Sequence, residues 1–162
     1  MWSVLLALAK CRQFHVTKIP HRCKEARATN VLIAALRSCR GASAALLQNL
    51  GADPCWQMNL SVSLVAEYTE IVHREGRPLG YSWQDCEDFL DYVCAAGIER
   101  PIYFRWRPVL PDPDDDLVLE LAVACGAAHI ITHNRRDFTE AERFGIVPLS
   151  PGEFLTKLRT LI

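Results

Sequence analysis

The feature that most constrains this chain is an alternation of short apolar runs with segments of helical period. The runs have the length of β-strands, and they cover residues 56–60, 102–106, 129–132 and 145–149. Proline, glycine and aspartate separate them from segments in which apolar residues recur every three or four positions. Strands that alternate with helices favour a mainly parallel sheet, because a parallel connection needs a crossover. The sequence therefore predicts a layered α/β fold.

Helices are predicted in the intervals between these strands. Ser63 is the expected N-cap of one helix, and Gly51, Gly97 and Gly126 are the expected C-terminal stops of three others. The predicted helices cover residues 43–50, 63–72, 81–96, 114–125 and 151–161. No internal repeat or low-complexity tract interrupts this order, so we expect one continuous domain.

The first 27 residues do not fit the pattern. Phe14 to Ile19 alternates enough to predict a strand, but residues 22–27 carry scattered charge and no clean period. The opening run from Val4 to Ala9 is short and has no positively charged flank before it, so we expect neither a secretory signal nor a membrane span. We therefore predict an atypical N-terminal segment over residues 1–27 and one domain over residues 28–162.

Charge and cysteine content limit the class of protein. The 162 residues include 18 basic and 19 acidic side chains, which gives a formal net charge of −1. A protein that held nucleic acid by phosphate neutralisation alone would show a basic excess, so any nucleic-acid role must come from a local site. Seven cysteines without a Cys-x-x-Cys pair indicate neither a disulfide framework nor a zinc ribbon. We expect a reduced, cytoplasmic protein.

Acidic side chains stand where predicted strands end or predicted helices begin. Asp112, the run Asp114–Asp116 and Asp137 have such positions, which is where open α/β sheets place their ligand sites, and Glu67 lies inside the helix predicted over residues 63–72. Several carboxylates can hold Mg²⁺ or Mn²⁺, and such an ion can activate water for attack on a phosphate. The plainer interpretation is that an aspartate before a helix is an N-cap. Taken alone, the two outer aspartates of the run fit that interpretation better.

A series of segments keeps a fixed order and spacing along most of the chain. Residues 112–122 (DPDDDLVLELA), 125–138 (CGAAHIITHNRRDF) and 145–155 (GIVPLSPGEFL) follow one another, and residues 29–33 and 60–68 precede them. These segments resemble the PIN-domain proteins that are found as toxins in toxin-antitoxin pairs. The resemblance covers about four-fifths of the chain. It implies a three-layer α/β/α PIN-like domain with a mainly parallel central sheet.

The resemblance also implies an activity and its residues. PIN toxins are Mg²⁺- or Mn²⁺-dependent endoribonucleases that hydrolyse RNA phosphodiester bonds, and the family suggests a homodimer and a small antitoxin partner. Glu67, Asp115 and Asp137 match three of the family's four acids, so we expect them to be the catalytic and metal-binding residues. The expected supporting residues are Asn30, Asp112, Thr132 and Asn134.

One position departs from the family pattern. Where the family has an aspartate immediately before Thr29-Asn30, this chain has Ala28, which cannot bind a metal. Two hypotheses explain it: a degenerated and weakly active domain, or a chain whose beginning was altered near residue 28. If the activity is lost, the alternative function is a catalytically inactive PIN-like module that binds an antitoxin or a second copy of itself.

Basic and aromatic side chains near these acids have two interpretations. His133, Arg135 and Arg136 have the chemistry to hold phosphates of an RNA backbone, although arginines on an exposed loop are more often simply solvated. The segment Arg105-Trp106-Arg107 has the chemistry to stack on a base and bind phosphate, but a strand edge covered by an aromatic side chain is the plainer explanation.

Overall fold

The protein contains a five-stranded sheet in which every neighbouring pair of strands is parallel. The computed structural model describes residues 23–27, 29–52, 55–105 and 107–160. The strand order is β3-β2-β1-β4-β5. The strands are β1 (Cys23–Arg27), β2 (Trp56–Leu60), β3 (Ile98–Glu99), β4 (His129–Ile131) and β5 (Val147–Leu149). The prediction of an α/β fold with a parallel sheet is confirmed, although the strands are short.

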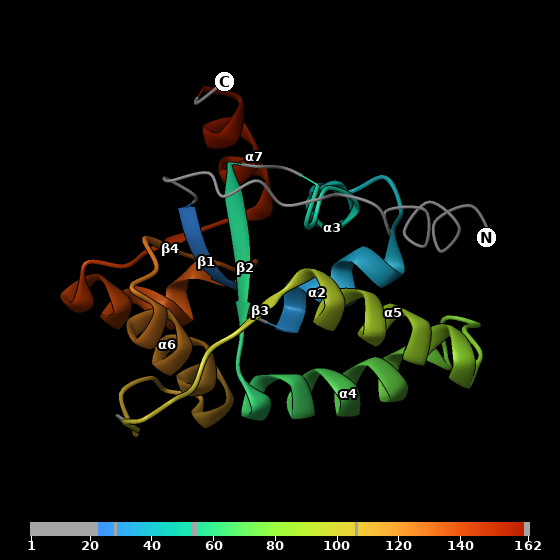
Figure 1. Cartoon of the computed structure of the whole chain (residues 1–162), viewed down its shortest axis with the longest axis horizontal. Helices are drawn as coiled ribbons and strands as arrows, with labels where there is room; N and C mark the ends of the chain where they lie inside the picture. Colours follow the sequence, from blue (N-terminus) through green and yellow to red (C-terminus); the bar gives the residue numbers. More distant parts are fainter. Residues whose placement is uncertain (1–22, 28, 53–54, 106, 161–162) are drawn as a thin grey trace.

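Helices cover the sheet and form the outer layers (Figure 1). The α-helices are α2 (Thr29–Arg37), α3 (Ala42–Gln48), α4 (Val62–Gly76), α5 (Trp83–Ala96), α6 (Pro113–Cys125) and α7 (Pro151–Thr160), and a 3₁₀ segment, η1, covers Arg135–Phe144. Helix α6 packs against β1, β2 and β4, whereas α2, α4 and α5 pack on one another on the other side of the strands (Figure 1). None of the described helices is long and apolar enough to cross a membrane.

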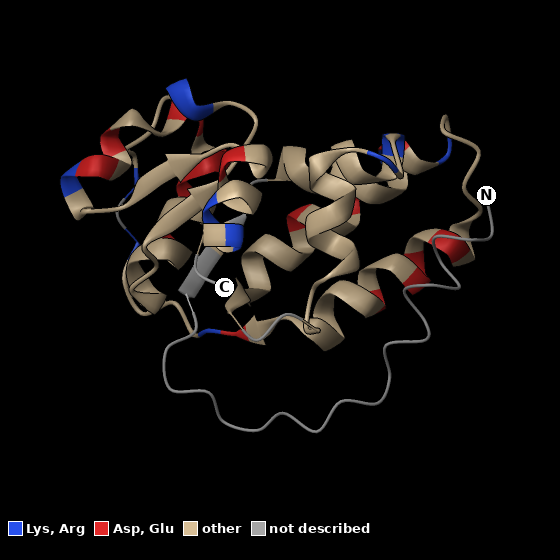
Figure 2. Cartoon of the chain, turned by 90° about the horizontal axis from the view of Figure 1, so that it is seen from above, with Lys and Arg blue, Asp and Glu red and all other residues tan. Residues whose placement is uncertain are grey.

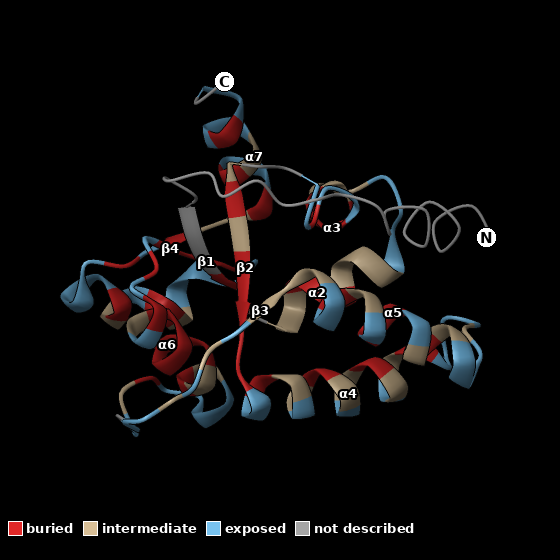
Figure 3. Cartoon of the chain, viewed as in Figure 1, coloured by how far each residue is buried: buried red, intermediate tan, exposed pale blue. Residues whose placement is uncertain are grey.

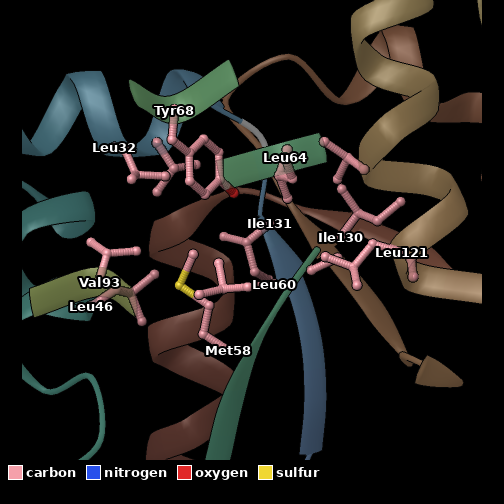
Figure 4. Packing of buried hydrophobic residues seen from close by; sticks show 14 of the residues in the cluster. Leu32, Leu46, Met58, Leu60, Leu64, Tyr68, Val93, Leu121, Ile130 and Ile131 are labelled. Atoms are coloured by element: carbon pink, nitrogen blue, oxygen red, sulfur yellow. The ribbon is translucent and has the colours of Figure 1, made fainter. Parts of the chain in front are cut away.

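Burial on both faces of the strands explains the layers. Successive side chains of a strand point to opposite faces, yet Ile130 and Ile131 of β4 are both completely buried. Figure 4 shows Ile130 near Leu121 of α6, while Ile131 lies near Leu60 on the side of Tyr68 from α4. Figure 3 shows that much of the α6 ribbon is coloured as buried, in line with the seven buried residues of this helix. A parallel sheet covered in this way carries apolar residues on both faces, which is why its strands have no alternating pattern.

The central strand comes from the charged segment in which the sequence predicted no strand. That expectation was wrong: β1 (Cys23–Arg27) pairs with β2 through Glu25↔Met58 and with β4 through Glu25↔His129. Its backbone bonds to neighbours on both sides, and Ala26 is fully buried. The predicted domain boundary after residue 27 therefore falls between β1 and α2. The strand predicted at residues 14–19 lies outside the described residues.

Two further expectations need correction. The N-cap of α4 is Ser61 instead of Ser63, because the Ser61 side chain accepts a hydrogen bond from the Leu64 amide at 3.3 Å. The predicted strand at residues 102–106 does not form over the described positions 102–105. Strand β3 pairs with β2 only through Asn59↔Ile98 and Leu60↔Glu99, and β2 ends at Leu60. Residues beyond Arg100 therefore have no remaining part of β2 to pair with.

Gly97 provides a test of how tightly β2 and α5 pack. A Cβ atom at Gly97 would lie 2.4 Å from Leu60 Cδ1 and 3.1 Å from the carbonyl oxygen of Val93, whereas one at Gly152 would meet no atom within 4 Å. We expect Gly97→Ala to lower the free energy of unfolding by about 1 to 3 kcal/mol through overpacking. The Gly152→Ala control should be neutral or stabilising by up to about 1 kcal/mol, because alanine favours the helix. Urea unfolding of both variants measures the difference, and equal stability would contradict the packing described.

Candidate metal centre

The candidate site lies where the strand order reverses. Strand β1 has β2 on one side and β4 on the other, and Arg27 at the end of β1 pairs with Ile131 at the end of β4. The chain leaves these two ends in α2, which begins at Thr29, and in the turn that begins at Thr132. Parallel sheets place ligands at the carboxyl ends of their strands at such a switch point. Position 28 lies between β1 and α2 in the chain, outside the described residues.

Asn30 ties the start of α2 to the turn after β4. Its side-chain amide donates to Thr132 Oγ1 at 3.0 Å, and its Oδ1 accepts from the His133 amide at 3.1 Å. The Asn134 amide also donates to Thr132 Oγ1, at 3.1 Å, and Thr132 is fully buried. Asn30, Thr132 and Asn134 therefore form one network that fixes the backbone of the turn.

Asn134 also holds one of the predicted acids. Its side-chain amide donates to Oδ2 of Asp137, which lies in the first turn of η1. Because Asn134 is itself held by Thr132, the network that starts at Asn30 reaches the Asp137 carboxylate. Three of the four predicted supporting residues are thus brought together with Asp137.

Glu67 reaches the site from α4. Its Oε1 accepts a hydrogen bond from Thr29 Oγ1 at the start of α2, while its Oε2 is buried and has no hydrogen-bond partner among the residues that the structure describes. Burial raises the pKa of Glu67, the Thr29 hydrogen bond acts in the opposite direction, and Asp114 and Asp112 raise the pKa further. A buried carboxylate oxygen without a partner is costly unless a donor or a cation meets it.

Asp115 is the acid on which the charges of the site converge. Burial raises its pKa from 3.8 to about 7, and the next causes are the nearby charges of Asp112, Asp137, Glu67 and Asp114. These neighbours come from α4, from the start of α6 and from η1. Glu67 and Asp137 therefore both lie near enough to act electrostatically on Asp115. Like charges in a partly buried site favour the protonated form, and a bound cation would reverse that preference.

The remaining aspartates at the start of α6 have structural partners. Asp112 is the N-cap and accepts from the Asp114 amide at 3.0 Å, so the capping role falls on Asp112 and not on Asp114 or Asp116. Asp116 is 1% exposed and accepts from the amides of Val109 and Leu110. It therefore fixes the loop before α6 instead of the helix end.

The carboxylate oxygens of the site have the chemistry that a hard divalent cation requires, but they do not form a complete coordination shell. Carboxylate oxygens are the ligands that Mg²⁺ and Mn²⁺ prefer, and the unpartnered Glu67 Oε2 together with the raised pKa of Asp115 indicates uncompensated negative charge. Yet among the residues that the structure describes, no group of three or more acidic, histidine or cysteine side chains is placed to hold a metal ion. The site therefore has the negative charge that a cation requires, but three ligand side chains are not placed together among the described residues.

Two contacts of the site were not predicted from the sequence. Thr29 holds Glu67, although Thr29 was noted only as part of the segment after Ala28. Ser43 of α3 lies 2.8 Å from Nε2 of His133, through its Oγ, and is 3% exposed. The partners in these pairs are 38 and 90 residues apart in the chain. The position of Thr29 beside the expected aspartate was an available signal, but nothing in the sequence links Ser43 to His133.

The comparison with known families agrees with this geometry. A family model described as PIN domain matches residues 28–136. The match begins directly after β1, includes Glu67 and Asp115, and ends one residue before Asp137. No curated protein matches the chain.

Charge repulsion at Asp115 predicts an unusual dependence of stability on pH. A carboxyl group whose pKa is raised on folding binds its proton more tightly in the folded state, so stability falls as pH rises from about 4 to about 7. We expect Asp115→Asn to raise the free energy of unfolding at pH 8 by on the order of 1 to 2 kcal/mol, after allowance for solvent screening, and to have little effect at pH 4. Urea unfolding at both pH values measures this. A lower free energy of unfolding for Asp115→Asn than for the native chain at pH 8 would contradict the raised pKa of Asp115.

Proposed function

This chain belongs to the PIN domain family, and we propose that it is a divalent-metal-dependent endoribonuclease of toxin type. The family and the fold are nuclease-like, which supports a hydrolase. The proposal goes further and assigns RNA as the substrate, with hydrolysis of its phosphodiester bonds. The observation that supports it is the partly buried Asp115, whose pKa is raised first by burial and then by neighbouring acids that include Asp137 and Glu67.

The proposed roles follow from the contacts of each side chain. Glu67, Asp115 and Asp137 would hold Mg²⁺ or Mn²⁺, with Asp112 adding negative charge beside them. When bound, the cation lowers the pKa of water and offsets charge that develops on a phosphate. Thr29 orients the Glu67 carboxylate and Asn134 orients that of Asp137, so each donor keeps one carboxylate oxygen in place.

The position of Asn30 and Thr132 supports a role in positioning. Their hydrogen bond joins α2 to the turn after β4, and the same threonine oxygen accepts from the Asn134 amide. Loss of either side chain would free the turn that carries Asn134 and, through it, Asp137. We propose that Asn30 and Thr132 position the metal-binding side chains and do not contact the substrate.

A second candidate function is supported by a specific observation. Ala28 removes one of the family's four acids, and the described acids do not form a group of three placed to hold a metal. Both facts suit a PIN-like module that has lost catalysis and acts by binding a small antitoxin or a second copy of this chain. The nuclease requires the carboxylates of Glu67 and Asp115, whereas the binding module does not.

Cleavage of a mixed-sequence RNA in Mn²⁺ distinguishes the two functions. We expect the native chain to cleave weakly, a chelator to abolish cleavage, and Ala28→Asp to increase it, because a fourth carboxylate improves the hold on the ion. Glu67→Gln and Asp115→Asn should each reduce the rate by roughly tenfold or more, since each removes a charged ligand. Asp91→Asn, on the exposed face of α5, is the matched control and should cleave at the native rate.

The alternatives give different results in the same assay. Cleavage by Ala28→Asp alone would favour the binding module, because the site would then lack only the missing acid. Equal rates for the native chain and both ligand variants would contradict the proposed nuclease site, whatever the chain itself binds.

A further inference from the structure

We propose that a pocket beside the carboxylates binds a backbone phosphate of the nucleic acid, next to the phosphate that is hydrolysed. The inference rests on the proposed nuclease function for the identity of the ligand. It concerns a separate set of side chains, which belong to the turn after β4 and to η1. The ligand chemistry is that of a phosphodiester in a single strand.

The pocket is open to solvent and is lined mainly by the turn after β4 and by η1. Its volume is about 550 Å³, and its lining consists of residues 133–136 with Thr139, Glu142 and Pro148. Asn134 belongs both to this lining and to the candidate metal centre, because its side chain donates to Asp137. The pocket and the acidic site therefore share a wall.

The basic side chains of the pocket are available for an anion. Arg136 is exposed and forms no ion pair with a carboxylate in the described part of the chain. Arg135 contacts Glu153 at 2.7 Å through one nitrogen, and both partners are about half exposed, so solvent weakens the pair. A guanidinium has five N–H donors, and most of those of Arg135 remain free. Glu142 is the one carboxylate in the lining, against two guanidinium groups.

His133 is held in the pocket by contacts on two sides. Its amide donates to Asn30 Oδ1 at 3.1 Å, and its ring Nε2 lies 2.8 Å from the Oγ of buried Ser43. The backbone and the ring are thus fixed to α2 and α3. A side chain held before the ligand arrives loses little conformational entropy on binding, which favours a specific contact over simple solvation.

Electrostatics explains why a phosphate site is needed at this place. A cluster of carboxylates repels a nucleic acid, and Figure 2 shows acidic and basic segments interspersed on the protein, in line with a net charge of −1. Affinity for a polyanion must therefore come from a local cationic site. Because Asn134 contacts Asp137 and also lines the pocket, a strand whose scissile phosphate lies at the carboxylates would bring a neighbouring phosphate to the pocket that Arg136 lines.

Binding of RNA without cleavage tests the pocket. The probe is a fluorescently labelled single-stranded RNA oligonucleotide, measured by anisotropy with the full chain in a chelator. Arg136→Gln should weaken binding by roughly tenfold, because a charge-assisted contact is lost, and should lower the slope of log affinity against log salt by about 0.7. Arg136→Lys should retain most of that slope.

Arg143→Gln is the matched control for this experiment. Arg143 lies in the same 3₁₀ segment, is exposed and pairs with Glu140 at 2.9 Å, but does not line the pocket. Its affinity should stay within about twofold of the native chain, as for other exposed ion pairs. Equal loss in both variants, no loss in either, or no binding by the native chain would overturn the pocket.

The two proposals fail in different ways. Manganese-dependent cleavage together with binding that ignores Arg136 would reject the pocket and leave the nuclease intact. Selective loss of binding in Arg136→Gln by a chain that never cleaves RNA would support the pocket and count against the nuclease.

Discussion

The parallel pairing of β1 with β2 on one side and β4 on the other is the constraint on which the fold and the site both depend. It brings the ends of two strands that are more than a hundred residues apart in the chain to one edge, in the register Arg27↔Ile131. Helix α2 and the turn after β4 start from that edge, and Asn30 joins them. Two candidate ligands are bonded to residues at this junction, because Thr29 of α2 donates to Glu67 and Asn134 of the turn donates to Asp137.

The acidic site destabilises the folded protein, because Asp115 is partly buried among like charges. Glu67, Asp115 and Asp137 lie on different elements, and the pKa of Asp115 is raised to about 7 by burial first and then by the nearby charges, those of Asp137 and Glu67 among them. Hydrogen bonds from Thr29 and Asn134 keep two of these carboxylates in place. Acids at the start of α6 also have ordinary structural uses, as Asp112 and Asp116 show, so proximity alone would prove little. Oε2 of Glu67 has no hydrogen-bond partner among the described residues, so it neither caps a helix nor fixes a loop. This distinguishes a candidate ligand site from a set of helix caps.

The sequence was informative where local pattern and packing agree. Strands β2 and β4 and helices α5 and α6 could be predicted, because buried apolar residues and caps mark them. Strand β1 could not, since its contribution comes from backbone bonds on both sides and its side chains are mostly charged. The aromatic run at residues 102–105 failed in the opposite way, because β2 ends at Leu60 and leaves it no partner strand. The order of the acids along the sequence predicted which residues belong to the candidate site. The effect of their charges on Asp115 could be seen only in the structure.

Ala28 affects stability and function in opposite directions. An aspartate between Arg27 and Thr29 would add a further negative charge next in sequence to the residue that holds Glu67, and without a cation this would increase the repulsion already present at Asp115. With alanine there, the folded chain has less negative charge to offset, so the proposed cation would contribute less to its stability. The same change leaves a cation with fewer ligands, and so a smaller hold on the ion. In the proposed nuclease, a weaker hold on the ion would leave more of the affinity for nucleic acid to side chains that bind the polyanion directly, which are the arginines of η1.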